Sequence, residues 1–149
     1  MKSITRKRII LIAIAIIGAL SASCSRNRGL LSELKTNQNT WTSKKVTHYR
    51  YTFFIGAMSP SDTVVIEVND GVRTSLTSTT GTVRTPERFD RYDTMDKIFQ
   101  TAADTINGSP EVELKYNPVF GYPTEIFASY HHATDSTVHY YISHFEVLK

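Results

Sequence analysis

The apolar residues of this chain repeat with helical spacing in two segments and alternate with strand spacing in two others. The helical segments are residues 30–41 and 94–108, and the alternating segments are residues 48–76 and 111–148. Antiparallel meanders commonly bury one sheet face under helices, so this order of elements predicts an α+β fold. We expect an antiparallel sheet of about six strands in two three-stranded meanders, with two helices packed on one face.

The first meander is predicted from residues 48–76. The segment HYRYTFFI, residues 48–55, is rich in aromatic residues and typical of a strand. Its alternation gives one face to Tyr49, Tyr51, Phe53 and Ile55. Residues 63–68 alternate in the same way, and Asp70-Gly71 is typical of a tight hairpin turn. One face of the returning strand is then expected to carry Val72, Thr74 and Leu76.

The two helices are predicted from apolar stripes. The first stripe consists of Leu30, Leu31, Leu34 and Trp41, and we expect Trp41 to enter the core. The second consists of Met95, Ile98, Phe99, Ala102, Ala103 and Ile106. Thr94 is suited to cap this second helix, because its hydroxyl can accept a hydrogen bond from a free backbone N–H. Asn107-Gly108 is expected to give a left-handed exit before Pro110.

The second meander contains the stretch YNPVFGYPTEI, residues 116–126. Asn117-Pro118 starts a turn, and Gly121 is expected to supply the positive φ that closes it. Pro123 cannot donate to a strand ladder, which predicts an edge or a bulge there. The flanking strands are expected at residues 111–116, 122–132 and 137–148. We interpret 116–123 as a structural corner, with a recognition loop as the alternative.

The N-terminal residues predict export. Lys2, Arg6, Lys7 and Arg8 precede an apolar run from Ile9 to Leu20. That run is shorter than the roughly 20 residues a membrane-spanning helix needs, and the pattern is typical of a secretory signal peptide. Removing it leaves 13 Lys and Arg against 14 Asp and Glu, so the basic charge belongs to the signal. A nucleic-acid partner is therefore not expected.

Cys24 is the only cysteine of the chain and follows the small residues of Ser21-Ala22-Ser23. This segment resembles a bacterial lipobox, although Ser21 stands where leucine is commonest. The resemblance implies that Cys24 receives diacylglycerol and anchors the protein to a bilayer; the alternative is ordinary cleavage and release. We expect a signal peptide at 1–23, a tether at 24–29 and one domain at 30–149. No aspartate follows Cys24, which favours an outer-membrane anchor facing the periplasm.

Residues 77–91 are polar and are expected to form a long exposed loop. Arg84, Arg88 and Arg91 could bind an anion there. In the alternative, the acidic residues Glu87, Asp90 and Asp93 neutralise these arginines.

Five histidines raise a metal hypothesis. With a turn at 133–136, His131 and His139 would face each other across two strands and could share one ion. A third ligand is wanted, and His132 and His144 would point to the opposite face. Exposed strand histidines without a metal are the alternative. From the sequence we identify no metal site, no cofactor and no catalytic residue, since no nucleophile elbow, phosphate loop or HExxH is found.

Several of these segments occur together in a known family. Trp41, HYRYTF, IEVNDG, TMDKIF, YNPVFGYPTEI and a final aromatic strand resemble, in that order, the bacterial lipoprotein family called domain of unknown function 6174. The resemblance extends from about Leu30 to Leu148. Members often carry cysteines after the first strand, whereas this chain has none between Ile55 and Ser61. The resemblance implies localisation and shape but no activity.

Together these features predict a non-catalytic envelope lipoprotein. Its partners would be the bilayer, through acylated Cys24, and an unidentified protein, peptide or small ligand. The alternatives are an envelope hydrolase and a metal-binding protein.

Overall fold

The computed structural model describes residues 26–56, 62–79, 83, 85–130 and 137–149. Six strands form one sheet in the order β3-β2-β1-β6-β5-β4, and every neighbouring pair is antiparallel. The strands are β1 (His48–Gly56), β2 (Asp62–Asn69), β3 (Val72–Ser78), β4 (Glu111–Tyr116), β5 (Pro123–Ser129) and β6 (Thr137–Val147). Two three-stranded meanders therefore meet through the pairing of β1 with β6. This confirms the predicted α+β class.

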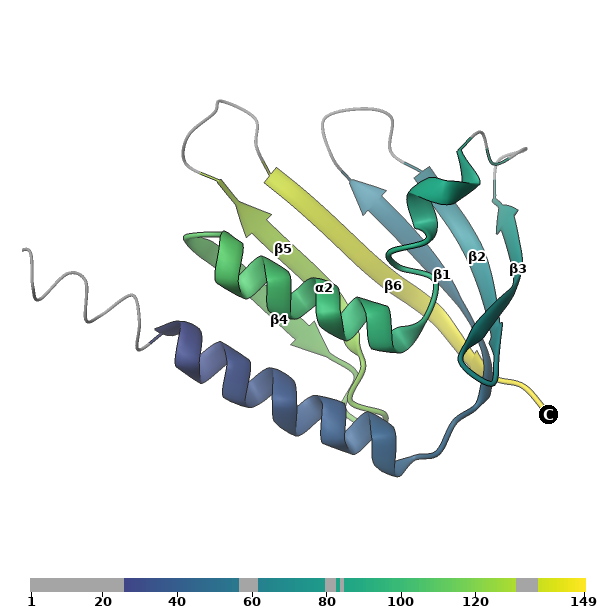
Figure 1. Ribbon diagram of the computed structural model, residues 1–149, viewed down its shortest axis with the longest axis horizontal. Coiled ribbons are helices and arrows are strands. Elements are labelled where there is room, and N and C mark those ends of the chain that lie inside the picture. Colours follow the sequence, from purple (N-terminus) through teal and green to yellow (C-terminus); the bar gives the residue numbers. More distant parts are fainter. Residues whose placement is uncertain (1–25, 57–61, 80–82, 84, 131–136) are drawn as a thin grey trace, which may run out of the picture.

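Both helices lie on the same face of the sheet (Figure 1). One is the N-terminal helix, residues 26–43, and the other is α2 (Met95–Gly108). A short 3-10 helix, η1 (Pro86–Phe89), precedes α2. Within the described ranges, none of the helices has both the length and the apolar character needed to cross a membrane.

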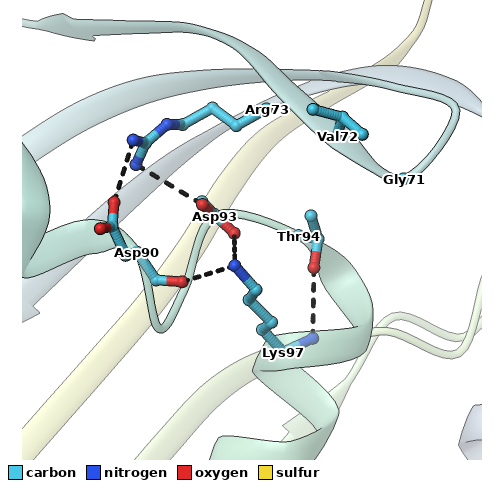
Figure 2. Close-up of a pocket in the computed structure, with 7 residues that line it drawn as sticks. All are labelled: Gly71, Val72, Arg73, Asp90, Asp93, Thr94 and Lys97. Carbon is cyan, nitrogen blue, oxygen red and sulfur yellow. Dashed lines mark hydrogen bonds and ion pairs between the residues drawn. The ribbon is translucent and has the colours of Figure 1, made fainter.

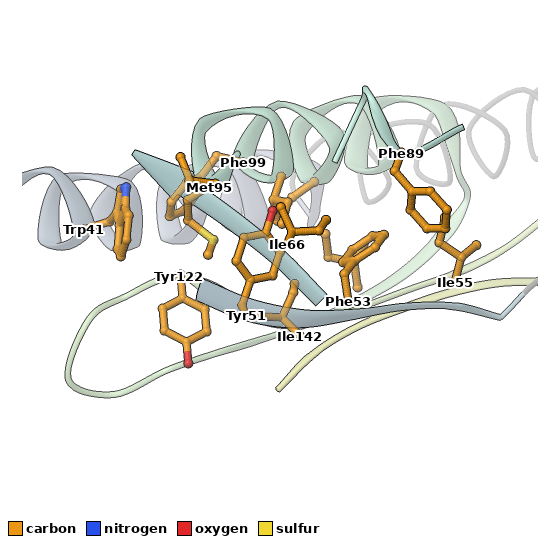
Figure 3. Packing of buried hydrophobic residues seen from close by; sticks show 14 of the residues in the cluster. Trp41, Tyr51, Phe53, Ile55, Ile66, Phe89, Met95, Phe99, Tyr122 and Ile142 are labelled. Atoms are coloured by element: carbon orange, nitrogen blue, oxygen red, sulfur yellow. The ribbon is translucent and has the colours of Figure 1, made fainter. Parts of the chain in front are cut away.

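The core lies between these helices and the sheet (Figure 3). Strand β1 contributes the alternating residues predicted to share a face, and Tyr51 and Phe53 are both fully buried. Trp41 enters the core as expected, with its ring 5.3 Å from that of Tyr49. The two buried tyrosine hydroxyls of β1 are paired: Tyr51 donates to the backbone oxygen of Tyr92 at 2.6 Å, and Tyr49 accepts from the backbone nitrogen of Met95 at 2.9 Å.

The N-terminal helix is longer than predicted. It begins by residue 26 rather than 30, so residues 26–29 of the expected tether are helical. The apolar stripe could not indicate this turn, because contacts distant in sequence hold it. The Arg26 guanidinium donates to the Val112 carbonyl at 3.4 Å, and the Asn27 amide donates to the Ile106 carbonyl at 3.1 Å. Cys24 and the predicted signal peptide, residues 1–23, lie outside the described residues.

Helix α2 has the predicted start and stripe but a different exit. Thr94 is the N-cap, and its hydroxyl accepts from the backbone nitrogen of Lys97 at 3.4 Å. Gly108 is not in the left-handed region, and Ser109 after it is extended, with φ −117°. The predicted left-handed exit is therefore wrong. The reason is that Ser109 precedes Pro110, whose ring favours an extended residue before it.

The face assignment on β3 is also wrong. The register between β2 and β3 shifts at Glu67/Val68, so that Ile66 pairs with Leu76 but Val68 pairs with Arg73. A β-bulge of this kind adds one residue to a strand and reverses the alternation beyond it. Val72 is consequently exposed, and Arg73 instead shares the helix-covered face with Leu76.

The described residues of the segment 77–91 are less open than the sequence suggests. The segment includes the end of β3 and the helix η1, and Phe89 is fully buried in the core. Val83 also packs against the core. The polar residues around Val83 and Phe89 gave no indication of these two core contacts.

Candidate functional site

No described helix covers the sheet face opposite the N-terminal helix and α2 (Figure 1). Because side chains alternate along a strand, every second residue of the buried strands must point to this open face. His48 lies there beside Glu67. Four further ring-bearing residues meet around β6 on the same face: Phe54, Phe127, His139 and Tyr141. We call them the open-face cluster. The Tyr141 side chain is 45% exposed, an unusual state for a large aromatic residue at the centre of a sheet.

Strand register brings the cluster together. Tyr141 is paired with Phe54 across β1 and β6, and His139 is paired with Phe127 across β5 and β6. The His139 ring meets the Phe127 ring at 6.0 Å and the Tyr141 ring at 5.7 Å, both edge to face. Gly56 lies opposite His139, and a β-carbon there would come within 2.8 Å of the Phe54 ring. Gly56 thus leaves the space that this ring occupies.

A carboxylate stands beside the cluster. Glu125 accepts a hydrogen bond from the Lys115 ammonium at 2.6 Å and lies 2.8 Å from His139 Nε2. The Glu125 side chain is 18% exposed. The Lys115 hydrogen bond holds the pKa of Glu125 below its ordinary value, and the His139 hydrogen bond acts in the same direction against the effect of burial. The charged carboxylate is therefore the favoured form at neutral pH.

The open face offers aromatic rings together with ion pairs, among them Glu125–Lys115 and Arg50–Glu146, a combination suited to recognition. Tyrosine and histidine rings present apolar area together with a polar edge. A hydrolytic triad would need a hydroxyl, a histidine and a carboxylate in one chain of contacts. We find His139 with Glu125, and separately the exposed His144 with Ser143 at 3.1 Å. These two pairs are not joined by a hydrogen bond, so they do not make a hydroxyl–histidine–carboxylate triad.

The predicted metal pair is wrong in register. His139 faces Phe127 across the β5–β6 ladder, not His131, because the ladder ends with Ser129 opposite Thr137. His131 and His132 lie outside the described residues, as does the turn at 133–136. Among the described residues no group of three histidine, cysteine or acidic side chains could hold a metal ion.

A second candidate is a polar pocket of about 490 Å³ between the β2–β3 hairpin, η1 and α2 (Figure 2). It is lined by Gly71, Val72, Arg73, Asp90, Asp93, Thr94 and Lys97. The bulge in β3 turns Arg73 into this pocket, where its guanidinium lies 2.9 Å from Asp90 and 3.6 Å from Asp93. The Lys97 ammonium lies 2.7 Å from Asp93 and donates to the Asp90 carbonyl at 2.8 Å.

The pocket charges are already balanced. Arg73 and Lys97 carry two positive charges, and Asp90 and Asp93 carry two negative ones. A charged ligand would have to displace an existing ion pair in a site where Asp93 is only 10% exposed. We therefore assign this network to holding the hairpin, η1 and α2 together.

The anion site of Arg84, Arg88 and Arg91 stays a prediction. Of the acidic residues expected to neutralise these arginines in the alternative, Asp90 and Asp93 pair with Arg73 and Lys97. Arg84 lies outside the described residues.

The β4–β5 turn has the corner geometry predicted for it. The Asn117 side chain accepts from the backbone nitrogens of Val119 and Phe120, each at 2.9 Å, and Gly121 has φ 81°. Pro123 lies opposite Tyr116 at the register shift, as its missing N–H predicts. The Tyr122 ring, whose direction the sequence left open, is buried and lies 4.6 Å from the Phe145 ring.

The sequence was also compared with known proteins. Searches of curated proteins and of solved structures gave no significant match. Residues 33–147 match the sequence model of a family of unknown function, DUF6174. This match spans most of the chain and nearly all of the described domain. The chain therefore belongs to the DUF6174 family, whose function is unknown.

Proposed function

We propose that this protein is a bacterial envelope lipoprotein that binds a protein, peptide or small ligand on its open sheet face, without catalysis. The anchor would be Cys24, acylated after removal of residues 1–23. Two acyl chains and an amide-linked third would hold the protein firmly, because a single chain gives only marginal membrane binding. The proposed location is the outer membrane, facing the periplasm.

The observation that carries the binding role is the open-face cluster. The opposite face of the same sheet is covered by two helices, yet Tyr141 remains 45% exposed at the centre of this one. Phe54, Phe127 and His139 are half-buried beside Tyr141. A contiguous apolar patch with polar residues at its edge is typical of interaction surfaces. The Glu125–Lys115 pair beside the patch could orient a polar group of the ligand.

The anchoring half of the proposal is tested by feeding cells a fatty-acid analogue. We expect wild type and Ser25→Ala to be labelled and Cys24→Ala to remain unlabelled. Equal labelling of Cys24→Ala would overturn the lipoprotein proposal. Ser25→Ala is the control because it changes the neighbouring residue and keeps the thiol.

The binding half is tested by a thermal-shift screen of envelope components and metal ions. A ligand of the open face should raise the melting temperature of wild type and should have little effect on Tyr141→Ala. A ligand that stabilises both variants equally would bind elsewhere. A rise limited to metal ions would favour the metal-binding alternative.

A further inference from the structure

The proposed anchor and the folded domain are very close in the chain. Only Ser25 separates Cys24 from Arg26, where the described helix begins. Two peptide steps span no more than about 8 Å between α-carbons, whatever conformation they adopt. An acyl group on Cys24 would therefore enter the bilayer within one or two side-chain lengths of Arg26.

The first turn of this helix is attached to the body of the domain. The Arg26 guanidinium donates to the Val112 carbonyl, and the Asn27 amide donates to the Ile106 carbonyl. Farther along the same helix, Leu34 is buried in the core. The start of the helix is thus held against the end of α2 and the start of β4. We call residues 26–29 and 106–112 the anchor end.

We infer that the anchor end lies against the lipid headgroups, so that the protein sits directly on the membrane in a fixed orientation. This inference rests on the proposed acylation of Cys24. Arg26 and Arg28 are exposed within four residues of the acyl group. A guanidinium binds phosphate oxygens through two parallel hydrogen bonds, and basic residues beside an anchor are attracted to anionic lipids.

The β2–β3 hairpin lies at the opposite end of the molecule. Figure 1 shows the start of the N-terminal helix and the end of α2 on the left and the hairpin on the right. The 18 residues of the helix alone, 26–43, span about 27 Å at 1.5 Å per residue. An anchored domain would therefore keep Val72 away from the bilayer and Asn107 beside it.

Two tryptophan variants of the full chain test this orientation. Asn107→Trp places a fluorophore at an exposed position of the anchor end, and Val72→Trp places one at the exposed hairpin. Each protein is isolated from membranes and reconstituted in vesicles containing a phospholipid with a nitroxide headgroup. The native Trp41 is buried, so the wild-type signal can be subtracted as a constant background.

We expect Asn107→Trp to lose most of its added fluorescence and Val72→Trp to keep it. Inserting about 12 Gly and Ser residues between Ser25 and Arg26 gives a flexible reach of roughly 20 Å and should abolish this difference. Equal quenching at both positions, or a difference that persists with the insert, would overturn the inference.

The mass of the same samples separates the two proposals. An acylated chain with equal quenching contradicts the orientation alone. A chain without an acyl group contradicts the proposed anchor, and the orientation with it.

Discussion

A β-carbon on Gly121 would stand 2.5 Å from the backbone oxygen of Asn37, closer than real β-carbons approach any atom. The β4–β5 turn is therefore packed against the N-terminal helix at a distance that only glycine allows. Gly121 also has a backbone φ of 81°, a value that residues with a side chain rarely adopt. One residue thus meets two separate requirements, one set by the turn and one by the helix beside it.

Alanine substitutions at three glycines distinguish the cost of the positive φ from the cost of the collision with the helix. Gly121→Ala meets both strain and collision, Gly71→Ala meets only the positive φ of 76°, and Gly108→Ala meets neither. We expect Gly108→Ala to be neutral or stabilising by up to about 1 kcal/mol, since glycine weakens helices. Gly71→Ala should cost about 1 kcal/mol and Gly121→Ala more than about 2 kcal/mol. Urea unfolding midpoints give this order.

The comparison of Gly121→Ala with Gly71→Ala tests the close packing of Gly121 against Asn37. If Gly121→Ala and Gly71→Ala destabilise the protein equally, the turn is not packed against the helix as described.

The Arg73 network should stabilise the fold more than an exposed ion pair does. Arg73→Ala leaves Asp93, a carboxylate only 10% exposed, with Lys97 as its remaining cationic partner. Loss of a partner to a buried charged group costs about 1–3 kcal/mol. Arg50→Ala, which breaks the exposed 2.8 Å pair with Glu146, should cost no more than about 1 kcal/mol. Similar unfolding free energies for the two variants would contradict the structural role of Arg73.

Much of this fold can be predicted from the sequence, because residues close together in the chain determine these features. The stripe of α2 fixes which side of the helix is buried, and Thr94 fixes where it starts. The alternation of β1 fixes its buried face. Asp70 and Gly71 both adopt positive φ, as the hairpin signal predicts. In each case neighbouring residues carry the whole signal.

The other features depend on contacts between distant residues. The first helical turn is held by Arg26 and Asn27, which bond to carbonyls 86 and 79 residues away. The bulge that turns Arg73 inward arises from pairing with β2, and local alternation assigned that face to Val72 instead. His139 was assigned the wrong partner for the same reason. The sequence predicts both helices on one face and so an open face on the other, but which rings meet on the open face depends on strand register.

Acid should weaken the Glu125–Lys115 ion pair of the open face. The pKa of Glu125 is lowered from 4.5, mainly by the hydrogen bond from Lys115, so folding favours its charged form. Its stabilising contribution is complete above about pH 4.5 and is lost as the pH falls through the lower folded pKa. Glu125→Gln should therefore lose less stability than wild type between about pH 5 and pH 3.

Lys115→Met provides the matching variant, since it removes the partner and keeps the carboxylate. Lys115→Met should likewise lose less unfolding free energy than wild type between about pH 5 and pH 3. The double variant should have nearly the same pH dependence as either single variant. Unchanged acid sensitivity in both single variants would show that the pair does not lower the pKa of Glu125.

The corner at Pro123 should matter for stability and not for binding. Pro123 is fully buried at the register shift between β4 and β5. We expect Pro123→Ala to lower the melting temperature and to leave ligand capture unchanged. A variant of unaltered stability that no longer captures its partner would instead identify the turn as a recognition loop.

The most direct test of the binding proposal is site-specific crosslinking in intact cells. A photoreactive amino acid is placed at Tyr141 on the open face, which is 45% exposed, or at Val72 on the β2–β3 hairpin, which is 64% exposed and so at least as accessible. We predict a crosslinked product from position 141 that is absent from position 72 and is lost when Phe127→Ala is added. Products from position 72 alone, or products at 141 that Phe127→Ala leaves unchanged, would contradict the assignment of the open face as the binding surface.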